Sequence, residues 1–169
     1  MLHQGKYKTL CLALLLFSGL VVACSSIDCP LNNTVYTTYV LKNAKLEPDT
    51  LKDTLYVWTP RQVAELGDTV LLNRSVRTTT FSLPMSYVND VDVLCFLRQT
   101  EKQTLLLDTV WVYKTNTPHF ESVDCSPNYF HEITDVKLTH NGIDSISIVN
   151  KTVNYVPKDN FYIYFKNIK

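Results

Sequence analysis

Thr104-Leu105-Leu106-Leu107-Asp108-Thr109-Val110-Trp111-Val112-Tyr113 is a run dominated by aliphatic, β-branched and aromatic residues, the types that favour strands. Side chains alternate along a strand, so one face carries Leu105, Leu107, Thr109, Trp111 and Tyr113, and the other Leu106, Asp108, Val110 and Val112. Because both faces are mostly apolar, the run predicts a strand near the centre of a sheet, buried on most of both sides.

Similar short runs, separated by Pro, Asn and Asp, continue on both sides of this stretch. The strands we expect are Val35–Leu41, Thr54–Trp58, Thr69–Asn73, Arg77–Leu83, Val91–Arg98, Thr104–Tyr113, Phe120–Val123, Tyr129–Thr139, Ile143–Val149 and Asn160–Phe165. No long amphipathic helix is expected. Many short strands at this spacing predict an all-β fold, an immunoglobulin-like antiparallel β-sandwich.

Two connections have local signals of their own. Asn141-Gly142 lies between alternating strands and predicts a type I′ hairpin, because both central residues of that turn need positive φ. Thr59-Pro60-Arg61-Gln62 fits either one helical turn, with Thr59 as its cap, or an irregular edge segment.

The N-terminus has the pattern of an export signal. Lys6 and Lys8 precede an uncharged, mostly apolar run from Leu10 to Ala23, which is shorter than the ~20 residues needed to span a bilayer. Leu20-Val21-Val22-Ala23-Cys24 resembles the lipobox of bacterial lipoproteins, which implies cleavage before Cys24 and its acylation; an ordinary secretory peptide is the alternative. We therefore expect a signal peptide over 1–23, a lipid-anchored linker over 24–32 and one β-sandwich domain over 33–169.

Five cysteines occur in the chain. Cys11 lies in the predicted signal peptide and Cys24 is the predicted lipid carrier, so Cys29, Cys95 and Cys125 remain in an oxidising compartment. Cys95 lies within an apolar run and is expected in the core. Cys29 and Cys125 lie in polar, turn-forming segments, and we predict a disulfide between them. The alternative is that both are free or bind metal, but neither has a partner at zinc spacing.

Charge and motifs argue against several functions. Removal of Lys6 and Lys8 leaves 14 basic against 16 acidic residues, and the chain has no cluster of basic residues that would bind nucleic acid. Only Gly67 and Gly142 remain in the mature chain, too few for a phosphate loop or nucleophile elbow. We expect no enzyme activity, catalytic residue, metal or cofactor.

The candidate ligand-binding side chains have structural alternatives. His119 is expected in a loop, His140 just before the turn, and His131 and Glu132 on opposite faces of a strand. Asn89-Asp90-Val91-Asp92 lacks the glycine and remaining ligands of a calcium loop and fits a solvated turn. The tyrosines at 87, 155, 162 and 164 suit either a sugar-stacking patch or ordinary sheet packing.

Several motifs recur together elsewhere. They are Asp28-Cys29-Pro30-Leu31-Asn32, Phe81-Ser82-Leu83-Pro84, Asp108-Thr109-Val110, Phe120-Glu121-Ser122-Val123-Asp124-Cys125, Thr139-His140-Asn141-Gly142-Ile143-Asp144-Ser145-Ile146, Asn150-Lys151-Thr152-Val153-Asn154 and Asn160-Phe161-Tyr162-Ile163-Tyr164-Phe165. Taken in this order they resemble an uncharacterised family of Bacteroidota lipoproteins, a domain of unknown function. That family usually has Gly after its second cysteine, where this chain has Ser126. The resemblance implies no activity.

Five Asp-Thr/Ser pairs followed by an aliphatic residue match the sequon on which Bacteroidota O-glycosylate exported proteins. The acceptors are Thr50, Thr54, Thr69, Thr109 and Ser145, of which Thr50 and Thr54 are expected to be the most exposed. The alternative is that Asp ends a turn and Thr begins a strand.

These features predict a lipoprotein anchored to the outer membrane by acyl chains on Cys24. Ser25-Ser26-Ile27-Asp28 lacks the paired acidic residues of the Bacteroidota surface-export signal, so we expect the protein to face the periplasm. We expect it to act as a binding or assembly partner of an envelope protein. The alternatives are a surface carbohydrate-binding or adhesive module and a periplasmic enzyme.

Overall fold

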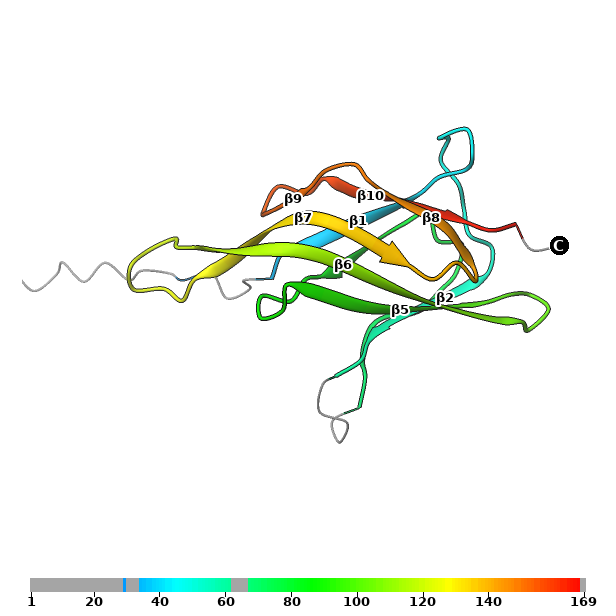
Figure 1. The fold of residues 1–169 in the computed structure, drawn as a ribbon, viewed down its shortest axis with the longest axis horizontal. Helices are drawn as coiled ribbons and strands as arrows, with labels where there is room; N and C mark the ends of the chain where they lie inside the picture. The colour runs from blue at the N-terminus through cyan, green and yellow to red at the C-terminus, as the bar shows by residue number, and fades with distance from the viewer. Residues whose placement is uncertain (1–28, 30–33, 62–66, 168–169) are drawn as a thin grey trace, which may run out of the picture.

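The computed structural model describes residues 29, 34–61 and 67–167, so Cys24, the predicted signal peptide and most of the linker lie outside the described residues. Within these ranges the chain forms ten strands and no helix (Figure 1). They are β1 (Tyr36–Leu41), β2 (Thr54–Thr59), β3 (Thr69–Ser75), β4 (Thr80–Pro84), β5 (Val91–Gln99), β6 (Leu105–His119), β7 (Asn128–Leu138), β8 (Ile143–Ile148), β9 (Thr152–Val153) and β10 (Asp159–Phe165). The described ranges accordingly hold no helix suited to crossing a bilayer.

The strands form two sheets, and the predicted all-β sandwich is confirmed. One sheet has four strands in the order β4-β1-β10-β8, and the other has six in the order β3-β2-β5-β6-β7-β9. Every pairing is antiparallel except that of β1 with β10, in which Leu41 lies opposite Ile163. The first and last strands therefore lie side by side in the middle of the smaller sheet (Figure 1).

Aromatic side chains join the two sheets. The Tyr39 ring stacks on Phe81 and Phe161 at centroid distances of 5.0 and 4.7 Å, and Phe96 from the opposite sheet lies 6.1 Å from Tyr39. All four rings are buried. Burial of such large apolar surfaces is the main stabilising contribution to a sandwich of this size.

β6 is central, as predicted, but its two faces differ in burial. Val110 and Val112 on the inner face are buried, whereas Leu105 and Leu107 on the outer face are 60 % and 47 % exposed. The expectation that both faces are covered is therefore wrong for the outer face, because no layer of the described chain packs against it. The strand also extends to His119, beyond a register shift after Tyr113.

Asn141-Gly142 does not form the predicted hairpin. β7 and β8 lie in different sheets, so the chain crosses between sheets here. The cause is Asp108, which is 1 % exposed and whose carboxylate accepts the backbone N–H groups of Asn141, Gly142 and Ile143 at 2.7, 2.7 and 2.8 Å. Its Oδ1 also accepts the hydroxyl of Thr139 at 2.9 Å. N–H groups that would pair in a hairpin are thus satisfied by one buried carboxylate.

Two other local expectations, for Phe120–Val123 and for Cys95, are wrong. Phe120–Val123 is not a strand but part of the loop that leads to Cys125. For Thr59-Pro60-Arg61-Gln62 the helical alternative is not seen, since Thr59 ends β2 and Pro60 and Arg61 are irregular; Gln62 lies outside the described residues. Cys95 is free but only partly buried, because it faces outward from β5. The short strand β9 was not predicted.

Candidate functional site

Cys29 and Cys125 form the predicted disulfide. Their Cα atoms lie 5.5 Å apart across 96 positions of sequence. The bond attaches the N-terminal segment to the loop between β6 and β7, next to Asn128 at the start of β7. It therefore fixes the end of the sandwich at which Cys29 lies.

A buried ion pair lies on the inner face of the six-stranded sheet. Lys114 of β6 places its Nζ 3.5 Å from Oδ1 of Asp92 on β5, and the same nitrogen donates to the carbonyl of Asn89. Burial raises the pKa of Asp92 and lowers that of Lys114, and in each case the charge of the other residue opposes the shift. The Asp92 carboxylate also accepts the Ser86 N–H at 3.3 Å.

His131 is buried close to this pair. Its Nδ1 lies 2.7 Å from the side-chain oxygen of Asn116. Burial, and secondarily the charge of Lys114, lowers the pKa of His131 to about 4, so the ring is neutral at neutral pH. His131 lines a cavity of about 450 Å³ with Asn128 and Tyr129, whereas Asp92 lines a separate groove of about 940 Å³.

The other sequence candidates lie elsewhere. His119 is the last residue of β6; it stacks on Phe130 at 4.3 Å and lies 3.3 Å from Glu121. His140 lies at the crossing between sheets, where its Nδ1 lies 2.7 Å from the carbonyl oxygen of Asp144. Within the described ranges, no group of three or more His, Cys, Asp or Glu side chains is placed to hold a metal ion.

The predicted placement of Glu132 is confirmed, since it is exposed while His131 is buried. Asn89-Asp90-Val91-Asp92 is a turn only in part, because Asp92 belongs to β5 and faces Lys114. The four tyrosines do not gather. Tyr87 stacks on Tyr129 and Tyr155 packs edge-on against Phe130, whereas the other two lie on β10.

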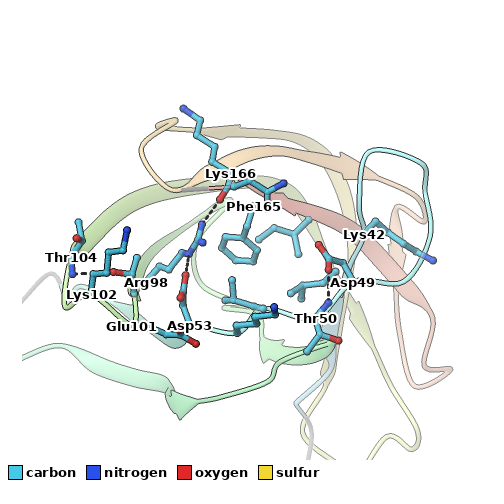
Figure 2. Close-up of a pocket in the computed structure, with 16 residues that line it drawn as sticks. Lys42, Asp49, Thr50, Asp53, Arg98, Glu101, Lys102, Thr104, Phe165 and Lys166 are labelled. Carbon is cyan, nitrogen blue, oxygen red and sulfur yellow. Dashed lines mark hydrogen bonds and ion pairs between the residues drawn. The ribbon is translucent and has the colours of Figure 1, made fainter. Parts of the chain in front are cut away.

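A polar cleft of about 470 Å³ occupies the end of the sandwich away from the disulfide (Figure 2). Arg98 of β5 lies at its base, where its Nε is 2.5 Å from Asp53 Oδ2 and its Nη1 donates to the Lys166 carbonyl at 2.6 Å. Its guanidinium carbon also lies 5.7 Å from the centre of the Phe165 ring. The rim carries charges of both signs, from Lys42, Lys52, Lys102, Lys166, Asp49 and Glu101. The Arg98 guanidinium is thus committed to contacts within the protein.

The outer face of the six-stranded sheet carries a row of partly exposed apolar side chains. The outer sheet face, as we call it, comprises Tyr56, Trp58, Val70, Val93, Cys95, Leu97, Leu105, Leu107 and Trp111. Register makes it continuous, since Trp58 lies opposite both Val70 and Cys95, and Leu97 lies opposite both Tyr56 and Leu107. All nine side chains are partly buried or exposed. A large exposed apolar patch is typical of a site of interaction.

The predicted glycosylation sites differ in accessibility. Thr50 is exposed, as expected, whereas Thr54 is half-buried as the first residue of β2. Thr69 likewise begins a strand, and its hydroxyl accepts from Arg61 at 2.7 Å. Thr109 and Ser145 are half-buried within β6 and β8, and Asp108 is committed to the crossing between sheets. The turn-then-strand explanation therefore fits Thr54 and Thr69.

Sequence reasoning missed Lys114, Asn116 and Arg98. All three continue the inward alternation of their strands, after Val112 on β6 and after Phe96 on β5. The signal was that alternation itself. Lys114 and Asn116 lie beyond the expected strand end at Tyr113, and Arg98 lies at the expected end of its own strand, where its inward position was not inferred.

These features define a disulfide-closed β-sandwich domain with an apolar outer face. The chain belongs to the family of unknown function DUF6452, whose model matches residues 59–165, from the end of β2 to the end of β10. The expected membership in a domain family of unknown function is confirmed. The link to Bacteroidota lipoproteins stays a prediction. No curated protein and no solved structure matches the chain.

Proposed function

We propose that this protein is a lipoprotein of the Bacteroidota cell envelope that binds a partner protein through its outer sheet face. Leu20-Val21-Val22-Ala23-Cys24 supports acylation of Cys24 and attachment to the outer membrane. Because the residues after Cys24 lack a surface-export signal, the domain faces the periplasm. Two or three acyl chains would hold it there, since one chain gives only marginal attachment.

The observation that carries the binding function is the outer sheet face. Trp58 lies between Val70 and Cys95, and Leu105, Leu107 and Val70 are the most exposed members of this face. Aromatic residues surrounded by aliphatic ones are typical of the central part of a protein interface. Water contact with this surface is unfavourable, and a partner that covers it would remove that cost.

The two alternatives have less support. A carbohydrate-binding module would benefit from a shared aromatic platform, but the four candidate tyrosines divide between two parts of the domain. An enzyme would need reactive groups free to meet a substrate. Lys114 and Asp92 instead pair with each other, and Asn116 occupies one nitrogen of His131.

Site-specific photocrosslinking in intact cells tests the proposed interface. A photoreactive amino acid at Leu105 or Leu107 should capture the same envelope protein, and Leu107→Asp should abolish its co-purification. The matched control is Leu46, a leucine with 63 % exposure in the loop after β1, against 60 % for Leu105. Equal capture from Leu46 and Leu105 would refute a specific interface on this face.

Anchoring and orientation are tested separately. The mass of the mature N-terminal peptide should show acyl chains on Cys24, and Cys24→Ser should release the protein from the membrane fraction. Protease added to intact cells should leave the domain uncut. Cleavage without lysis would contradict the periplasmic orientation.

A further inference from the structure

Exposed hydrophobic side chains gather on three loops at one end of the sandwich. Residues 85–90 carry Tyr87 and Val88, residues 120–127 carry Phe120 and Val123, and residues 154–158 carry Tyr155 and Val156. We call these the anchor-end loops. They hold six of the thirteen exposed large hydrophobic residues of the described chain, although they form a small part of it.

Ring contacts place two of these loops against the start of β7, which the third loop leads into. Tyr87 stacks on Tyr129 at 5.1 Å, and Tyr155 meets Phe130 edge-on at 4.9 Å. Tyr129 and Phe130 directly follow the 120–127 loop at the start of β7. In Figure 1 that loop marks the left of the view, opposite the labelled C-terminus. The apolar tips thus belong to a single end of the molecule.

The disulfide ties this same end to the predicted lipid. Cys125 lies in the 120–127 loop, and its partner Cys29 follows Cys24 by five positions. Five residues span at most about 18 Å even when fully extended. Acyl chains on Cys24 would therefore hold the anchor-end loops against the bilayer surface.

We propose that the anchor-end loops insert their apolar side chains into the interfacial layer of the membrane that holds Cys24. This inference rests on the proposed acylation. Tyrosine suits that layer because its ring is apolar and its hydroxyl stays in contact with water. Val123 is 96 % exposed, which in the isolated domain leaves an aliphatic side chain almost wholly in water.

The charges of these loops define the kind of membrane surface. They carry Asp90, Glu121 and Asp124 against Lys158 alone, and Glu121 also lies 3.3 Å from His119. A net negative end is repelled by anionic headgroups, so attraction to acidic lipid does not drive the contact. The surface recognised is a neutral, zwitterionic one, entered by apolar side chains.

The test uses the full-length, acylated protein reconstituted in phosphatidylcholine vesicles, with or without lipids brominated near the headgroup. Phe120→Trp places a fluorescent reporter on an anchor-end loop, and Leu46→Trp places the control at the opposite end; the two positions are 62 % and 63 % exposed. The parent protein supplies the signal of Trp58 and Trp111 for subtraction. Brominated lipid should reduce the added Phe120→Trp fluorescence roughly twofold and leave that of Leu46→Trp unchanged.

The outcomes separate this inference from the function on which it rests. An unquenched Phe120→Trp signal in protein whose N-terminal peptide carries acyl chains overturns the membrane contact alone. A peptide without acyl chains overturns the anchor as well. A blue shift in the emission of the Phe120→Trp protein that depends on protein concentration and not on bromine would show that the loops contact a second copy of the chain. That result also overturns the proposal.

Discussion

The buried Asp108 carboxylate allows a sharp test of how the two sheets are joined. Asp108→Asn keeps the shape of the side chain but exchanges one oxygen for an NH₂ group. In the native protein each oxygen accepts two hydrogen bonds, from Thr139 and Asn141 on one side and from Gly142 and Ile143 on the other. An amide nitrogen cannot accept, so two of the four donors lose their acceptor and face another donor.

The magnitude follows from those four contacts. Hydrogen bonds to a charged group contribute about 1.5–3 kcal/mol each, and a buried donor left unpaired costs about 1–3 kcal/mol. Two lost bonds therefore predict a decrease of about 3–5 kcal/mol in the free energy of unfolding, with some of the cost relieved by local rearrangement. That is a large part of the total stability of a domain of this size, typically about 5–15 kcal/mol.

Urea denaturation followed by far-UV circular dichroism measures this difference. The control is Asp144→Asn, an exposed aspartate two residues from Gly142, which should change the unfolding free energy by less than about 0.5 kcal/mol. A loss below about 1 kcal/mol for Asp108→Asn would show that the carboxylate does not hold the crossing between sheets.

Three further predictions concern the disulfide and the buried ionic groups. Cys125→Ser should lower the unfolding free energy by about 4–5 kcal/mol in the chain-entropy description, measured against the wild type under oxidising conditions. His131 has a folded pKa of about 4 against about 6.5 when unfolded, so its contribution is complete above pH 6.5 and is lost as the pH falls toward 4. His131→Gln should therefore flatten the fall in stability between pH 6.5 and 4, by on the order of 2 kcal/mol. Lys114→Met should cost about 2–4 kcal/mol because it leaves Asp92 without its cation, and combining it with Asp92→Asn should cost less than the sum of the two single changes.

Each of these predictions has a result that contradicts it. An unchanged stability of Cys125→Ser would mean that the crosslink adds nothing to the folded domain. Parallel pH profiles for wild type and His131→Gln would remove His131 from the acid response. Strict additivity of the Lys114 and Asp92 substitutions would show that the two charges do not interact.

The sequence was sufficient to predict most strands from local composition, and the disulfide from the number and surroundings of the cysteines. Alternating β-branched and aromatic residues located most strands, and the turn-forming surroundings of Cys29 and Cys125 identified the disulfide. The strands depend on a few neighbouring residues, whereas the disulfide joins positions 96 apart and could be predicted only because few cysteines remained to pair. Local preference and tertiary structure agreed there, so the predictions held.

The sequence was insufficient where the deciding contact is remote. Asn141-Gly142 has the composition of a hairpin turn, but its N–H groups bond to Asp108, more than thirty positions earlier in the chain. Lys114 and Asp92 become a pair only through the register of β5 and β6 and the extension of β6 past Tyr113. The exposure of the outer sheet face likewise depends on which face of the six-stranded sheet the smaller sheet covers. Alternation within a single strand does not specify this.

The parallel pairing of β1 with β10 has a consequence for the order of folding. The Thr38 N–H donates to the Asn160 side chain at 3.0 Å across 122 positions of sequence, and β8 joins the smaller sheet only through β10. Half of that sheet therefore stays unpaired until the last strand has arrived, and such distant pairing is slow because a long loop must close first. A chain cut before Asp159 would leave the edges of β1 and β8 open for pairing with other chains. The two halves of the smaller sheet can thus join only after β10 has been made.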